Sequence, residues 1–249
     1  MTSVSLEELL LLEPPRRNHA HTEFNGSHAR IAYMYSETIG QHYYAQNHPM
    51  KPSRLALTHD LVMSYQLHKE MSIYKAPVAS FQDLTKFHSK EYISFLKNKT
   101  EDTDHYLPLT NDCPLFESVF EYCQEYAGAS LTSAQLINNN ECDIAINWSG
   151  GLHHSHRTSA SGFCYVNDIV IAIQELLKNN PRVLYIDIDC HQGDGVQEAF
   201  YDSDRVMCVS FHRFGQTPEG WSFFPGTGSL QESGCGAGIN FSLNIPLMQ

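Results

Sequence analysis

The strongest constraint on this chain lies in residues 182–195, which read Arg-Val-Leu-Tyr-Ile-Asp-Ile-Asp-Cys-His-Gln-Gly-Asp-Gly. The apolar run 183–186 has the β-branched and aromatic side chains of a buried strand, and glycines then turn the chain. Side chains alternate along a strand, so Asp187, Asp189 and His191 are expected on one side at its carboxyl end. Their alternative role is to cap the following turn. Asp-x-His also offers the oxygen and nitrogen ligands that zinc accepts.

A second polar cluster follows another apolar strand, residues 143–146, and places His153 and His154 directly after two glycines. Adjacent imidazoles on a glycine loop have no packing purpose. Each is a useful general acid or base when a carboxylate fixes its tautomer, and the first stretch supplies Asp187 and Asp194. The two stretches are therefore predicted to be halves of one site.

Strands and helices alternate through the second half of the chain, which favours an α/β fold with a parallel sheet covered on both faces. With 249 residues, of which 42% are hydrophobic, the chain can bury one substantial core. The expected elements are strands at 29–35, near 77, at 143–147, 182–188 and 205–210, and helices from Pro52, at 81–96, 116–137 and 166–179.

Several motifs together resemble the zinc-dependent histone deacetylases of the class I type. They are Gly-Gly-Leu-His-His at 150–154, Ala-Ser-Gly-Phe-Cys-Tyr-Val-Asn-Asp at 160–168, Asp-Ile-Asp-Cys-His at 187–191 and Phe-Pro-Gly-Thr-Gly at 224–228, with further matches at 47–52 and 112–114. The resemblance implies a three-layer, mostly parallel α/β fold of the arginase/deacetylase type, incomplete at its C-terminal end. Residues 29–249 would be the N-terminal two-thirds of a catalytic domain. Residues 1–28 are expected to be a partly disordered extension.

The resemblance also assigns roles to individual residues. It implies that His153 with Asp187 and His154 with Asp194 are catalytic, and that Asp189 and His191 bind zinc. The remaining assignments are substrate binding by Asp112, Gly162, Phe163 and Phe224, an acetate channel lined by Arg54, and a K⁺ held near Asp187 by Ser210. Without the resemblance, Asp112 is equally well explained as a cap for the helix that follows it.

The implied activity is hydrolysis of the acetyl amide of N-acetyl-lysine in histones or other proteins, linked to transcriptional repression. A net charge of −12 favours basic partners such as acetylated histone tails and disfavours nucleic acid. Seven cysteines without regular spacing, and no apolar run of membrane length, indicate a reduced protein without a membrane partner. Corepressor subunits are further implied partners, in the nucleus or alternatively also the cytoplasm.

Three features depart from the family pattern. Gln192 stands where the family has a second histidine, and the loop at 216–222, which includes Trp221, is longer. The sequence also ends at Gln249, before the family's third zinc ligand and its oxyanion-stabilising tyrosine. Two alternatives therefore stay open, a catalytically weak or inactive truncated isoform that acts as a binding or regulatory module, and a deacetylase for acetylpolyamines or other small amides.

Overall fold

A computed structural model describes residues 29–98 and 112–247. The extension expected at residues 1–28 lies outside these ranges. The described strands and helices are β1 Ile31–Met34, η1 Ile39–Gln41, α2 Ser53–Ser64, η2 Leu67–Glu70, β2 Ser72–Tyr74, α3 Phe81–Leu84, α4 Lys90–Asn98, α5 Val119–Asn138, β3 Ile144–Asn147, α6 Asp168–Leu176, β4 Val183–Asp187, α7 Asp194–Ala199, β5 Val206–Arg213, η3 Gly236–Gly238 and β6 Ser242–Leu247. None of the described helices is both long and apolar enough to cross a membrane.

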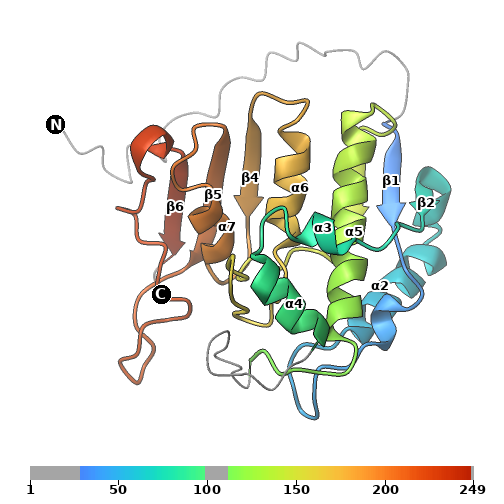
Figure 1. The fold of residues 1–249 in the computed structure, drawn as a ribbon, viewed down its shortest axis with the longest axis horizontal. Coiled ribbons are helices and arrows are strands. Elements are labelled where there is room, and N and C mark those ends of the chain that lie inside the picture. The colour runs from blue at the N-terminus through green and yellow to red at the C-terminus, as the bar shows by residue number, and fades with distance from the viewer. Residues whose placement is uncertain (1–28, 99–111, 248–249) are drawn as a thin grey trace.

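The strands form two three-stranded sheets, ordered β2-β1-β3 and β4-β5-β6, and every pair is parallel. This arrangement confirms the predicted parallel α/β class. The carboxyl ends of β1, β4, β5 and β6 point the same way in Figure 1. Loops that follow different strands are therefore brought to one edge, where α/β proteins form their sites.

Helices cover both faces of the first sheet. On one face, Ala32 and Met34 pack with α5 residues such as Ala129. On the other face, the hydroxyl of Tyr33 lies 3.2 Å from Nδ1 of His59 in α2. The sheet is thus enclosed between α5 and α2, which makes this half of the molecule three-layered.

The long helix α5 follows the predicted pattern closely. Apolar residues recur at helical spacing over the predicted range 116–137, and all of them are buried, namely Phe116, Val119, Phe120, Cys123, Ala127, Leu131 and Ala134. All of them except Ala134 belong to one core cluster, and α4 packs alongside α5. Because the period of 3.6 residues places these side chains on one face, the sequence alone predicts the packing of this helix.

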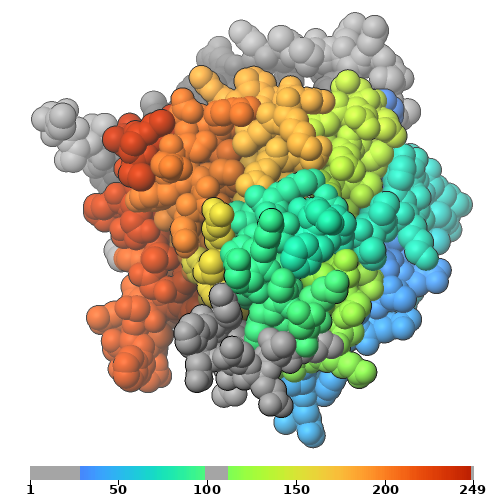
Figure 2. All heavy atoms as spheres, in the orientation of Figure 1, coloured from blue at the N-terminus to red at the C-terminus, as the bar shows by residue number. Residues whose placement is uncertain are grey.

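The second sheet is covered on one face by α6 and α7, through a core that includes Val170, Val196 and Val206. Figure 2 shows the same side of the molecule with all atoms drawn, and the teal and green residues of α3 and α4 lie over its centre. Along the strands of this second sheet, every other side chain points to the opposite face, away from α6 and α7. Large apolar residues are exposed there, namely Leu184, Ile186, Phe211 and Leu243.

Some local predictions differ from the structure. The helical spacing of Leu57, Leu61 and Tyr65 predicts an apolar face for the helix that starts near Pro52, yet these side chains are exposed and α2 buries Leu55 and Val62 instead. Periodicity identifies an apolar helix face, but it does not show whether the fold turns that face toward the core or toward solvent. The helix expected at 81–96 is two helices, because Ser80 caps α3 and a turn separates it from α4.

Candidate active site

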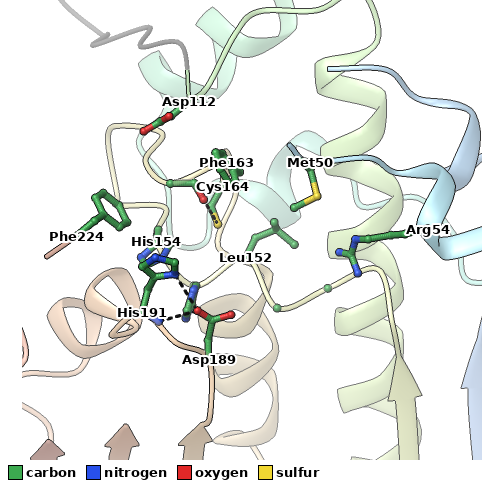
Figure 3. A pocket seen from close by; sticks show the side chains of 14 residues that line it. Met50, Arg54, Asp112, Leu152, His154, Phe163, Cys164, Asp189, His191 and Phe224 are labelled. Carbon is green, nitrogen blue, oxygen red and sulfur yellow. Dashed lines mark hydrogen bonds and ion pairs between the residues drawn. The ribbon is translucent and has the colours of Figure 1, made fainter. Parts of the chain in front are cut away.

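A cavity of about 600 Å³ opens at the carboxyl ends of the strands, and it gathers residues from segments far apart in the sequence. Figure 3 shows the cavity between the histidine loop, the loop after β4 and the start of α2. Its lining residues are Met50, Arg54, Asp112, Gly150, Gly151, Leu152, His153, His154, Gly162, Phe163, Cys164, Asp189, His191 and Phe224. Most of the predicted site residues therefore share one cavity.

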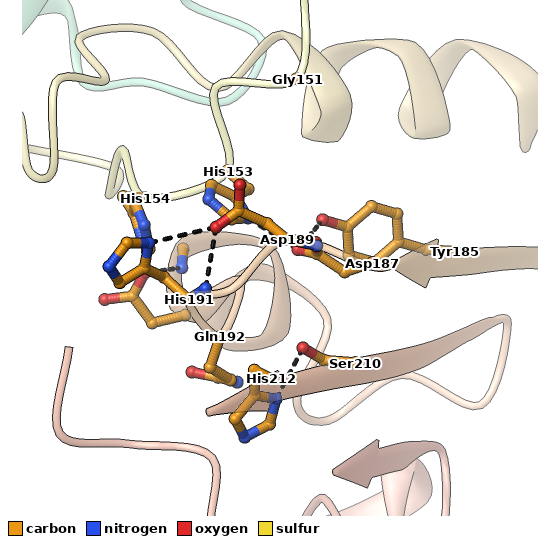
Figure 4. Close-up of polar contacts among 12 residues, drawn as sticks. Gly151, His153, His154, Tyr185, Asp187, Asp189, His191, Gln192, Ser210 and His212 are labelled. Atoms are coloured by element: carbon orange, nitrogen blue, oxygen red, sulfur yellow. Dashed lines mark hydrogen bonds and ion pairs between the residues drawn. The ribbon is translucent and has the colours of Figure 1, made fainter. Parts of the chain in front are cut away.

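The first imidazole, His153, is fixed by the last residue of β4. Its Nδ1 lies 2.7 Å from Oδ2 of Asp187, and both side chains are buried. The hydroxyl of Tyr185 donates to the same oxygen at 2.5 Å (Figure 4). Burial opposes protonation of His153, but the hydrogen bond and charge of Asp187 outweigh it, so the pKa of His153 is raised.

The second imidazole, His154, has its own carboxylate at the start of α7. Its Nδ1 lies 2.7 Å from Oδ1 of Asp194. Burial lowers the pKa of His154, and the positive neighbour His153 adds to this effect. Burial would raise the pKa of Asp194, yet the contacts with His154 and then His156 lower it to about 2. The two adjacent histidines thus have pKa values displaced in opposite directions.

Gly162 allows the chain to pass close to His154. Its φ of 49° lies in the left-handed region, and a Cβ at this position would be only 2.5 Å from Cδ2 of His154. A larger residue would therefore push the imidazole out of place. This close approach gives Gly162 a steric role beside the reactive groups.

Two phenylalanines border the cavity. The ring of Phe224 packs edge-on against His154 with centroids 4.8 Å apart, and the ring of Phe163 packs edge-on against His48 at 4.9 Å. Phe163 is held further by a hydrogen bond from the Tyr44 hydroxyl to its carbonyl, at 2.8 Å. Figure 3 shows the two rings on different sides of the opening, which makes part of the cavity wall apolar.

Asp189 and His191 present an oxygen and a nitrogen side by side. Nδ1 of His191 lies 3.1 Å from Oδ1 of Asp189, and the His191 amide donates to the same oxygen at 2.8 Å. Both side chains are partly exposed to the cavity. Within residues 29–98 and 112–247, no group of three or more His, Cys, Asp or Glu side chains is arranged to hold a metal ion.

Asp112 lies at the mouth of the cavity and does not cap the helix that follows. Helix α5 begins at Val119, and its N-cap position is Ser118, well after the turn that contains Asp112. The capping interpretation of Asp112 is therefore wrong. Arg54 also lines the cavity, at the end away from Phe224 in Figure 3.

The structure does not join Ser210 to Asp187 through their side chains. The two residues are opposite each other in the register of β4 and β5, but the Ser210 hydroxyl lies 2.8 Å from Nδ1 of His212. A K⁺ site at this position stays a prediction. Gln192 is buried and accepts a hydrogen bond from Thr227 at 2.8 Å, so the unusual residue supports the loop that carries Phe224.

The predicted set lacks two residues that contact the histidine–carboxylate pairs, and a third that contacts one of these two. They are Tyr185, His156 and Glu198. Tyr185 was detectable, because it precedes Asp187 by two positions and alternation puts both on one face of the strand. His156 is the third histidine of His-His-Ser-His, but no sequence signal links it to Glu198 on a distant helix.

Comparison with known proteins identifies the class of the fold and site. Residues 48–249 match the family described as "Histone deacetylase domain". The chain is 49% identical over 225 residues to "Histone deacetylase 9" of Arabidopsis thaliana, covering 88% of this chain and 52% of that protein. It is 51% identical over 230 residues to "Histone deacetylase B" of Dictyostelium discoideum, covering 90% and 53%.

A third relative, "Type-1 histone deacetylase 1" of Dictyostelium discoideum, is 49% identical over 225 residues, covering 88% of this chain and 44% of that protein. The chain therefore belongs to the histone deacetylase family, as the motifs predicted. It spans about half the length of the curated relatives it matches.

Proposed function

We propose that this chain carries the amide-cleaving residues of a zinc-dependent deacetylase that acts on N-acetyl-lysine in histones or other proteins. The main support is the pair of buried His–Asp contacts, His153–Asp187 and His154–Asp194, beside a single cavity. Two imidazoles with separate carboxylate partners are suited to take and return a proton during hydrolysis.

The cavity suits a long uncharged side chain. An acetylated lysine has an apolar stem that ends in a neutral amide, and the rings of Phe163 and Phe224 offer apolar walls for that stem. Asp112, which lines the mouth of the cavity, would accept hydrogen bonds from the backbone of a bound peptide. Arg54, at the opposite end, would attract the acetate ion that is released.

The opposite pKa displacements suggest a division of labour between the two histidines. Because its pKa is lowered, His154 is neutral near pH 7, and its Nδ1–H bonded to Asp194 leaves Nε2 free to take a proton from the attacking water. His153, whose pKa is raised, holds a proton for the departing lysine amine. Groups whose environments separate their pKa values commonly form such acid–base pairs.

Asp189 and His191 would supply two of the protein ligands for zinc. Their chemistry fits the ion, because a carboxylate oxygen and an imidazole nitrogen are usual zinc ligands and the two lie in contact on the cavity wall. When bound there, zinc would polarise the amide carbonyl and make water a stronger acid. Asp187 and Asp194 are hydrogen-bonded to His153 and His154, so we assign these two carboxylates to the imidazoles and not to the zinc ion.

Further assignments follow from the family and from the charge of the chain. A net charge of −12 would attract lysine-rich histone tails, which favours a protein substrate over a small amide. Corepressor subunits as partners, transcriptional repression and action in the nucleus are proposed from the family membership alone.

A set of matched substrates tests the substrate class. The zinc-loaded protein is incubated with an acetyl-lysine histone peptide, the same peptide without the acetyl group, and acetylspermidine, and released acetate is measured. Acetate from the acetylated peptide, at a higher kcat/KM than from acetylspermidine, is expected. A preference for acetylspermidine would support the small-amide alternative, and tight peptide binding without acetate would support a binding module.

A further inference from the structure

His156 lies on the far side of Asp194 from the catalytic imidazole. Its Nε2 is 3.5 Å from Oδ2 of Asp194, while Oδ1 of the same carboxylate is 2.7 Å from Nδ1 of His154. Its other nitrogen, Nδ1, is hydrogen-bonded to Oε2 of Glu198. The groups therefore form a continuous row, His154–Asp194–His156–Glu198, that runs from the cavity to the surface.

The charges along this row alternate. The contact with Asp194, more than the contact with Glu198, raises the pKa of His156 to about 9, so its ring is a cation near pH 7. The lowered pKa of Asp194 keeps that side chain anionic between the two imidazoles. A carboxylate that contacts a cation is a weaker acceptor for a second, neutral donor such as His154, because the cation already neutralises part of its negative charge.

The loop that carries the histidines is bound by the N-cap residue of α6 and packs closely against α7. The Asn167 side chain donates to the Ser155 carbonyl at 2.9 Å. A Cβ on Gly195 would lie 2.4 Å from that carbonyl, so the absence of a side chain at Gly195 lets the helix and the loop touch. His156 is thus positioned by packed backbone on both sides of its contact with Asp194.

We propose that His156 is a positioning residue, which shares Asp194 with His154 and thereby sets how strongly the carboxylate binds the catalytic imidazole. Only the effect of this sharing on turnover rests on the proposed catalytic role of His154. The sharing itself is a property of the folded chain, and it can be measured without turnover.

The test is NMR spectroscopy of the 249-residue protein labelled with ¹⁵N-histidine, at one pH near 7. The observed signal is the Nδ1–H resonance of His154, which moves downfield as its hydrogen bond to Asp194 strengthens. His156→Gln removes the cation, and His156→Lys keeps it. Glu198→Gln removes the outer partner at a side chain that is 65% exposed, so this variant folds even where a change at His156 does not. His59→Gln, on α2, is the matched control.

The expected result is a downfield shift in His156→Gln, a smaller one in Glu198→Gln, and no shift in His156→Lys or His59→Gln. A lowered unfolding temperature in His156→Gln with an unmoved resonance would overturn the proposal, because it would mean a structural role only. Equal shifts in His156→Gln and His156→Lys would also overturn it, since the charge would then not matter. These outcomes hold whether or not the chain releases acetate, so they are separate from a failure of the proposed function.

Discussion

Nδ1 of His153 and Oδ2 of Asp187 lie 2.7 Å apart, although 34 positions separate the two residues in the chain. The adjacent His154 reaches Asp194 at the same distance, across 40 positions. One glycine loop thus delivers two neighbouring imidazoles to two different carboxylates. Each ring has its own charge environment, which is the basis of the proposed acid–base pair.

A methyl group at Gly162 should damage the site through sterics alone. In Gly162→Ala the new Cβ would meet the His154 ring at 2.5 Å, so we expect acetate release to fall by at least about tenfold, the loss typical of a misplaced catalytic group. Gly220→Ala is the matched control, because Gly220 also has a positive φ but a Cβ added there would meet nothing within 4 Å. Equal losses in both variants would mean that backbone strain, and not contact with His154, is responsible.

The stability of the protein should depend on pH through Asp194. Its pKa falls from an ordinary 3.8 to about 2 in the folded chain, so its stabilising effect is complete above about pH 4 and is lost as the pH falls towards 2. At about 1.4 kcal/mol per pKa unit, the contribution is about 2 kcal/mol. Urea unfolding of the protein and of Asp194→Asn at pH 6 and pH 3 should show a difference that shrinks at the lower pH. A difference that does not change with pH would contradict the role of this carboxylate.

Zinc binding should depend on Asp189 and His191 but not on the residue between them. His191→Ala and Asp189→Ala should each weaken zinc affinity by at least about 10-fold, since loss of even an outer partner of a metal ligand costs that much. Cys190→Ser is the control, because Cys190 is an exposed thiol that does not line the cavity. Isothermal titration with zinc measures all three variants. Loss of affinity in Cys190→Ser alone would assign the ion to the thiol.

Asp112 should contribute to peptide binding through its charge and hydrogen bonds. Asp112→Ala is expected to lower the affinity for an acetylated basic peptide several-fold, and the loss of affinity should be larger at low salt than at high salt. Asp60→Ala makes the same change in net charge on α2, and Asp60 does not line the cavity. Fluorescence anisotropy at two salt concentrations compares them. If the two substitutions weaken peptide affinity equally, Asp112 acts only through the net charge of the protein and makes no specific contact.

The sequence predicts the parallel fold and the convergence of the site because strand ends and glycine loops leave few alternatives. Asp187 ends β4 of one sheet, and the histidine loop follows β3 of the other sheet. Because the strands of both sheets run the same way (Figure 1), their following loops lie at one edge of the molecule. The buried face of α5 was predictable for a similar reason, since its periodicity spans the whole helix.

Other features depend on tertiary contacts that no local pattern encodes. The exposed stripe of α2 has the same spacing as a buried one, and only the tertiary contacts of α2, mainly with η1 and η2, decide which face turns inward. Aspartate is a common N-cap residue, which suggests a cap at Asp112, but α5 begins only at Val119, after an intervening turn. His156 meets Glu198 across 42 positions, a pairing that the sequence does not reveal.

The most direct test of the proposed acid–base pair is acetate release from an acetyl-lysine peptide by the zinc-loaded protein and by His154→Ala, with peptide binding measured in parallel. Because a positioned general base contributes about 10² to 10⁴ in rate, we predict that the substitution lowers turnover by at least about 100-fold while the peptide still binds. Equal rates of acetate release from the two proteins would contradict the assignment of His154, and with it the proposed function.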